Sequence, residues 1–222
     1  MRAGSGEIGM LESIGYKELM GGLAVAIMVA AYGVQLWKTY EGKSEPHPIA
    51  WAGFALLTGV GFLVQIQKEA GAGSWVMGAT AIFCVLISGM AQYKRRWLLK
   101  EFGRWDWGAL AAGIALFALY LGSKNFSWGP ILSAALATSA DLVLYVPIFT
   151  KAWTLPQMEN RTSYALNSLK FIPSFFAMES YSWETCLYPA ALVVMNAVVV
   201  IYLFWRRRCL AGQVKHEKCN LK

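Results

Sequence analysis

Three polar side chains interrupt long runs of apolar residues in this sequence. Asp141, Lys170 and Asn196 each fall near the middle of such a run. An ionisable residue within a membrane span costs about 2.5–3.5 kcal/mol on insertion scales, so it usually serves a function. We therefore expect a midplane cavity in which Asn196 offers an amide to a polar solute and Asp141 binds or releases a proton.

A second interpretation of the same residues is structural. Asp141 and Lys170 would form a buried ion pair between neighbouring helices, and Asn196 would bridge helices through hydrogen bonds. A buried pair of this kind rarely stabilises more than apolar packing does, so it does not explain why charged residues stand there. The sequence leaves both interpretations open.

Aromatic, amide and proline residues extend the candidate site. Trp51, Tyr164 and Asn167 are further candidates for lining a pocket, although Trp51 and Tyr164 also suit anchoring at the membrane interface. Pro147 and Pro173 lie inside expected helices, where each removes a backbone hydrogen bond and permits a kink. These two prolines are candidate hinges, and static kinks are the alternative.

The surrounding elements have the composition of an integral membrane protein. Only 15% of the residues are charged and 57% are hydrophobic, whereas a soluble domain carries about 25% charged residues. A helix needs about 20 apolar residues to span the bilayer. Seven segments meet this requirement: Leu19–Trp37, Pro48–Gln67, Trp75–Tyr93, Trp107–Ser123, Trp128–Thr150, Thr162–Met178 and Thr185–Trp205.

Basic residues predict the orientation of these seven segments. Fifteen of the 20 Lys and Arg fall in the alternate connections and the tail that share one membrane face. They are Lys38, Lys43, Lys94, Arg95, Arg96, Lys100, Arg104, Lys151, Arg161, Arg206, Arg207, Arg208, Lys215, Lys218 and Lys222. The opposite face has Arg2, Lys17, Lys68 and Lys124. The positive-inside rule therefore predicts an N-terminus outside and a cytoplasmic C-terminus, and the short loops favour a prokaryotic inner membrane.

An internal repeat links the first three segments to the last three. An offset of 113 residues places Tyr32 on Tyr145 and Lys38 on Lys151, and the segment boundaries coincide. The predicted fold is thus an all-α integral membrane protein of seven transmembrane helices, arranged as two parallel three-helix repeats joined by a linker helix. The expected parts are an extracytoplasmic segment 1–18, the first repeat 19–97, the linker 98–124, the second repeat 125–208 and a tail 209–222. The first-repeat positions that match the three polar residues are apolar: Met28, Leu57 and Phe83.

Two short segments resemble a known motif. Residues 32–38 (YGVQLWK) and 145–151 (YVPIFTK) are similar to degenerate PQ-loop motifs, with Gln35 kept in one copy and Pro147 in the other. The chain therefore resembles the SWEET and PQ-loop transporters, which share their fold with the KDEL receptor. The resemblance implies a carrier, with an acidic residue near the second motif available for proton coupling. SWEET sugar carriers place an Asn in the last helix of each unit, and here Phe83 departs from that pattern.

These observations favour a carrier for a small polar solute that works by alternating access, with the lipid bilayer as its surroundings. A receptor or a subunit of a membrane assembly on the same fold is the alternative, and association into a homo-oligomer stays open. A retinal protein needs a Lys in the last helix, which has none. No cluster of His or Cys residues predicts a metal or a cofactor, no nucleophile motif predicts an enzyme, and the placement of the basic residues argues against nucleic acid.

Overall fold

The computed structural model describes residues 4–95, 101–123 and 129–220, and in this part of the chain every regular element is a helix. The helices are α1 (Gly4–Tyr40), α2 (Pro48–Gln67), η1 (Gly71–Ser74), α3 (Trp75–Arg95), α4 (Arg104–Ser123), α5 (Gly129–Val143), α6 (Val146–Thr154), η3 (Pro156–Met158), α7 (Arg161–Leu169), α8 (Phe171–Phe176) and α9 (Trp183–Asn220). The helix α1 thus begins within the expected N-terminal segment, and α9 continues through most of the expected tail. The basic residues Arg2, Arg96, Lys100, Lys124 and Lys222, used above for orientation, lie outside the described residues.

In the described part of the chain, six helical segments are long and apolar enough to cross a membrane, which makes this a multi-pass membrane protein. They are Gly15–Tyr40, Pro48–Gln67, Gly71–Arg95, Arg104–Ser123, Ala134–Thr154 and Trp183–Gly212. Large apolar side chains such as Leu63, Ile82 and Ile201 are exposed on the outside of the bundle, where lipid chains would contact them. Polar side chains are instead found among the buried residues, as expected when the surrounding solvent is apolar.

Prolines divide two of the expected spans. Pro147 has no backbone N–H for the carbonyl of Val143, and its ring crowds that carbonyl; α5 ends at Val143 and α6 begins at Val146. In the same way Pro173 falls four residues after Leu169, where α7 ends. The expected sixth span, 162–178, is therefore two short helices rather than one continuous helix.

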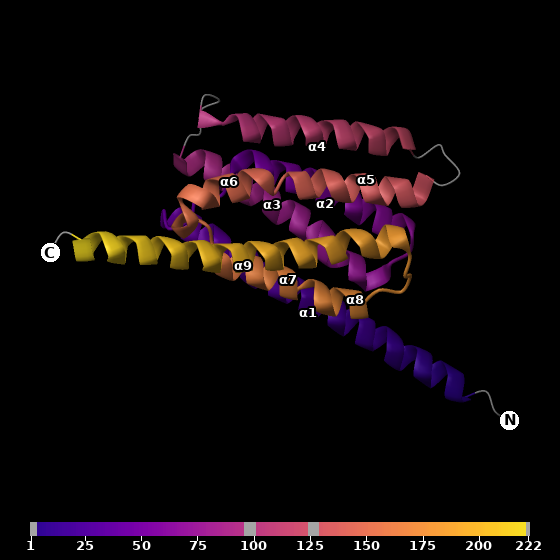
Figure 1. Ribbon diagram of the computed structural model, residues 1–222. Helices are drawn as coiled ribbons and strands as arrows, with labels where there is room; N and C mark the ends of the chain where they lie inside the picture. The colour runs from indigo at the N-terminus through magenta and orange to yellow at the C-terminus, as the bar shows by residue number, and fades with distance from the viewer. Residues whose placement is uncertain (1–3, 96–100, 124–128, 221–222) are drawn as a thin grey trace.

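The helices pack into one bundle (Figure 1), in which their contacts define two groups. In the first group, α3 packs against both α1 and α2; in the second group, which runs from α5 to α9, α9 packs against both α5 and α7. The groups meet through α1 against α7 and α8, and through α2 against α5. The remaining helix, α4, packs on α5 and α6 at one side of the bundle. The interface between the two groups is where the candidate site lies.

Candidate functional site

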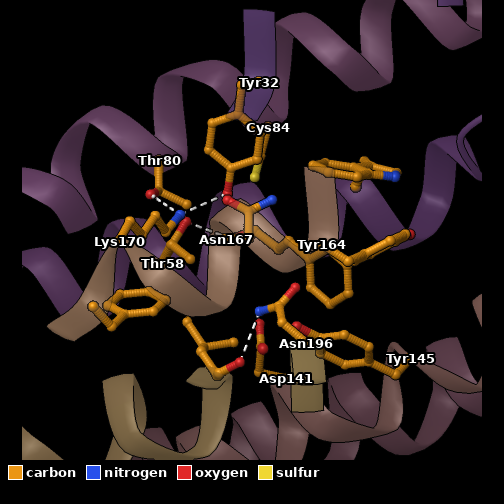
Figure 2. A pocket seen from close by; sticks show the side chains of 14 residues that line it. Tyr32, Thr58, Thr80, Cys84, Asp141, Tyr145, Tyr164, Asn167, Lys170 and Asn196 are labelled. Carbon is orange, nitrogen blue, oxygen red and sulfur yellow. Dashed lines mark hydrogen bonds between the residues drawn. The ribbon is translucent and has the colours of Figure 1, made fainter. Parts of the chain in front are cut away.

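A small cavity of about 30 Å³ lies between the two groups of helices (Figure 2). Its volume suits roughly two water molecules. Every residue that lines it is at most 6% exposed, so the cavity lies deep inside the bundle. The lining residues are Tyr32, Trp51, Phe54, Thr58, Thr80, Cys84, Asp141, Tyr145, Tyr164, Asn167, Lys170, Phe171, Leu192 and Asn196.

Lys170 enters this cavity from the break between α7 and α8. Its Nζ donates hydrogen bonds to the Tyr32 hydroxyl at 2.9 Å and to the Thr80 hydroxyl at 2.7 Å. The same Nζ lies 4.5 Å from the centre of the Tyr32 ring and 4.9 Å from that of Phe171, within the range of cation–π attraction. Tyr32 and Thr80 belong to the first group of helices, so Lys170 connects the two groups.

Asp141 lies in α5, within a turn of the break before α6. Its Oδ1 accepts a hydrogen bond from the Tyr188 hydroxyl at 3.0 Å, whereas its Oδ2 is buried without a hydrogen-bond partner among the described residues. In Figure 2 Lys170 lies beside Thr80 and Tyr32, and Asp141 lies on the other side of the cavity beside Asn196 and Tyr145. Within the described chain, neither Asp141 nor Lys170 takes part in a salt bridge. The structural interpretation based on a direct ion pair is therefore wrong.

The remaining polar groups of the cavity retain unused hydrogen-bonding capacity. The Asn196 amide donates to the Leu192 carbonyl at 2.7 Å, one turn back on α9. The Asn167 amide has a long contact of 3.5 Å with the Ser163 hydroxyl, and its Oδ1 is buried with no partner in the described structure. The same is true of the Trp51 indole Nε1. Buried polar atoms are almost always satisfied, so these atoms are suited to water or to a ligand.

One lining residue connects the cavity to the end of the bundle where the basic residues gather. The Tyr164 hydroxyl donates to Glu159 Oε2 at 3.0 Å, and Glu159 Oε1 pairs with Lys151 Nζ at 3.0 Å. Lys151 also donates to the Glu45 carbonyl. Because Glu45 lies in the loop between α1 and α2, this chain of contacts joins the second group to the first.

Further contacts close the same end, which we call the basic end (Lys38, Lys94, Arg95, Lys151 and Arg206 to Arg208). Lys38 Nζ, at the end of α1, donates to Asn160 Oδ1, the N-cap residue of α7, at 3.0 Å. Arg207 donates to the carbonyls of Pro156 and Glu159. The Ser44 hydroxyl and the Glu45 N–H both donate to the Met158 carbonyl, at 3.2 Å and 3.0 Å, so the loop 41–47 and the segment 155–160 are held against each other across the two groups.

The opposite end is closed by η1 packed on the end of α8. Ser174 Oγ donates to the Gly73 carbonyl at 2.9 Å, and the Glu179 N–H donates to the Ala70 carbonyl at 3.2 Å. Gly73 allows this approach, because a Cβ there would lie 2.6 Å from Met178 Cγ and 2.9 Å from the Ser174 carbonyl oxygen. Closure at both ends leaves the cavity occluded.

Comparison with models of protein families, with curated proteins and with solved structures finds no match.

All six residues predicted to bind a solute line the cavity, namely Asn196, Asp141, Lys170, Tyr164, Trp51 and Asn167. The three residues predicted as hinges or as parts of the PQ motif, Gln35, Pro147 and Pro173, do not. Pro147 and Pro173 follow the helix breaks, while Gln35 lies at the basic end, where its Nε2 donates to the Ser44 hydroxyl at 3.0 Å. Among the described residues, no three His, Cys, Asp or Glu side chains gather so that they could hold a metal ion.

Sequence reasoning missed four residues that determine how the charged groups are held. Thr80 and Tyr188 lie inside apolar segments, Glu159 lies in a connection, and Tyr32 was noted only as part of a motif. A hydroxyl within an apolar segment is the only signal for Thr80 and Tyr188, and such hydroxyls are common in membrane helices because the helix backbone also satisfies them. Their pairing with Lys170 and Asp141 depends on helix packing.

Proposed function

We propose that this protein is a membrane carrier for a small polar solute, and that it works by alternating access between its two groups of helices. The observation that carries the proposal is the enclosed polar cavity at the interface of the two groups. Polar and ionisable side chains within a membrane usually mark a substrate or ion pathway. Transporters place such sites near the bilayer midplane, between structural repeats.

The positions of the lining residues support a repeat around this cavity. Four pairs related by the offset of 113 residues contribute both of their members to the lining. The pairs are Tyr32 with Tyr145, Trp51 with Tyr164, Phe54 with Asn167, and Thr58 with Phe171. Unrelated helices would have no reason to present matching positions to one cavity, so the pairs favour two parallel three-helix repeats that face each other.

The packing of the helices supports the same arrangement. In each group the third helix, α3 or α9, lies between the other two, and the first helix of each group packs against the second helix of the other. The residues before α2 and α7, His47 and Asn160, are both N-cap residues and are also 113 positions apart. On this proposal α7 and α8 together make the sixth crossing in chain order, which brings the number of crossings to seven, with α4 as the linker, as in the SWEET and PQ-loop transporters that the motifs resemble.

The proposed orientation puts the basic end in the cytoplasm, since Lys and Arg are retained on that side. The N-terminus is then outside and the C-terminus is cytoplasmic, in a prokaryotic inner membrane. To release a solute inward, the protein would separate loop 41–47 from segment 155–160; to accept one from outside, it would separate η1 from α8. Asp141 is the proposed proton-coupling group, because Oδ2 is unpartnered within the described chain and belongs to the cavity lining.

The test is solute flux into proteoliposomes that contain the purified protein, screened with sugars, amino acids, vitamins and nucleosides. We expect one chemical class to enter faster than into protein-free liposomes, and Asp141→Asn to remove the dependence of that flux on a proton gradient. Absence of flux for every class, from folded protein that copurifies with a partner, would instead support the receptor or assembly-subunit alternative.

A further inference from the structure

The cavity holds one basic and one acidic side chain, and neither has a partner of opposite charge in the described residues. Lys170 is held by two hydroxyls, and Asp141 by one. Hydroxyls solvate an ion only partly, and a buried ion without a counter-charge is costly in an apolar medium. A bound molecule that brought both missing counter-charges would reduce this cost at both residues.

Unsatisfied hydrogen-bonding groups accompany each charge. A Lys ammonium has three N–H donors, and the structure uses two of them. Trp51 Nε1 is a further donor without a hydrogen-bond partner among the described atoms. Asp141 Oδ2 and Asn167 Oδ1 are acceptors that likewise have no hydrogen-bond partner there. The cavity therefore offers donors and acceptors together, as a ligand with both a carboxylate and an ammonium group requires.

We propose that the cavity binds a compact zwitterion, with its carboxylate at Lys170 and its ammonium at Asp141. The proposal rests on the carrier function above and names its substrate class. A simple anion would satisfy Lys170 and leave Asp141 without a counter-charge, and a simple cation would do the reverse. A neutral polyol would compensate neither charge. The cavity of about 30 Å³ is smaller than any such molecule, so binding requires the helices around it to move apart, and its walls, which include Tyr32, Tyr145 and Tyr164, favour a zwitterion of few atoms.

Four two-carbon compounds of similar size separate these classes. Glycine carries both charges, glycolate carries only the carboxylate, ethanolamine carries only the ammonium, and ethylene glycol carries neither. Binding to the purified protein is measured as the concentration that gives half of the maximal thermal stabilisation, since a ligand stabilises the state it binds. We expect glycine or its longer homologues β-alanine and γ-aminobutyrate to act at concentrations at least about tenfold below those of the other three, a difference of about 1.4 kcal/mol.

Two variants assign the ends of the ligand. Asp141→Asn is expected to bind glycine no more tightly than glycolate, and Lys170→Gln is expected to bind glycine no more tightly than ethanolamine. Glu41→Gln and Lys43→Gln serve as matched controls, because they remove the same charges from a pair in the loop after α1, where the Lys43 side chain is 67% exposed. These controls should keep the wild-type preference.

The wild-type series decides the proposal even if a cavity variant does not fold. Stabilisation by glycolate, ethanolamine or ethylene glycol at concentrations equal to those of the zwitterions would overturn the proposal. The absence of stabilisation by any zwitterion up to about 100 mM would also overturn it, because binding would then be too weak for this site. The carrier function fails separately. Zwitterion binding in detergent without flux into proteoliposomes would contradict transport and support the ligand class. Flux of a sugar, with no flux of a zwitterion, would support transport and contradict the ligand class.

Discussion

If the basic end opens as proposed, Glu159 favours its closed state indirectly, by positioning Lys151, which donates to the Glu45 carbonyl of the first group. The substitution Glu159→Gln should then change how often that end opens. The Glu159 side chain is 1% exposed and that of its partner Lys151 is 9% exposed. Removing one member of such a buried pair costs about 3–5 kcal/mol. Lys151 keeps the Glu45 carbonyl as an acceptor, and a Gln side chain can still bind Tyr164. We therefore expect a smaller loss, about 2–4 kcal/mol, in the free energy that favours the closed end.

Cys84 is a native cysteine that can report this opening, so no cysteine has to be introduced. Its side chain lines the cavity and is 1% exposed, so a membrane-impermeant thiol reagent reaches it only when one end opens. The rate of modification then follows the population of the open state. With Cys186, Cys209 and Cys219 replaced by Ser, Glu159→Gln should raise the rate from the basic side by about 30- to 700-fold, which is 2–4 kcal/mol at about 1.4 kcal/mol per tenfold. The increase stops where the end is open in most molecules.

The matched control is Glu45→Gln, which removes a carboxylate from the same end. Glu45 pairs with Arg95 on the surface, where the two side chains are 30% and 39% exposed. Exposed pairs contribute about 0–1 kcal/mol, so this variant should raise the rate by no more than about fivefold. Equal rates for Glu159→Gln and Glu45→Gln, or an increase only from the side opposite to the basic end, would refute the role given to Glu159.

Three further outcomes follow from other contacts. Tyr188→Phe should cost about 1.5–3 kcal/mol of stability if Asp141 is ionised in the occluded state, and only about 0.6 kcal/mol in an Asp141→Asn background, as measured by reversible unfolding in SDS; equal costs in both backgrounds would contradict the ionised form. Gly73→Ala should prevent closure of the opposite end, because its Cβ would lie 2.9 Å from the Ser174 carbonyl oxygen, and labelling of the cavity cysteine from that side should rise at least about fivefold. At the basic end, burial lowers the pKa of His47 below its ordinary value of 6.5, so the folded state favours the neutral ring, and stability present above about pH 6.5 should be lost as the pH falls below it. His47→Asn should flatten that pH dependence of the thermal midpoint, and an unchanged profile would assign it to another group.

Hydropathy was sufficient to predict an all-helical, multi-pass membrane protein, because a membrane span must be long and apolar whatever its neighbours are. It was not sufficient where a proline divides a span. The sequence contains Pro147, Pro173 and Pro189, all within apolar segments. A helix ends four residues before each of the first two, whereas Pro189 lies inside a continuous helix. At Pro189 the helix continues, and the Gln65 side chain donates at 3.0 Å to the Thr185 carbonyl that the proline leaves without its donor. That hydrogen bond comes from a different helix, so the local sequence does not predict it.

The candidate site was predictable in its charged residues and not in its partners. The cost of placing Asp141 and Lys170 in a membrane marks them from sequence alone. Whether they pair with each other depends on how far apart the packed helices hold them. Tyr188 and Thr80 instead form hydrogen bonds with Asp141 and Lys170, respectively. Nothing in the spacing of the sequence distinguishes a hydroxyl that points into a cavity from one that forms a hydrogen bond with its own helix.

The division of chemistry between the two groups bears on how a carrier of this construction would move. Asp141, Lys170 and Asn196 all belong to the second group, whereas Tyr32 and Thr80, the hydroxyl partners of Lys170, belong to the first. If the groups separated as proposed, the spacing between the charges would be retained, and Lys170 would lose both of its hydroxyl partners. A buried ammonium that loses its acceptors needs others, and a carboxylate that arrives from the opening end supplies them. Under the proposed function, a bound zwitterion would therefore compensate the contacts that opening breaks, and its departure would favour their return and the closure of the cavity.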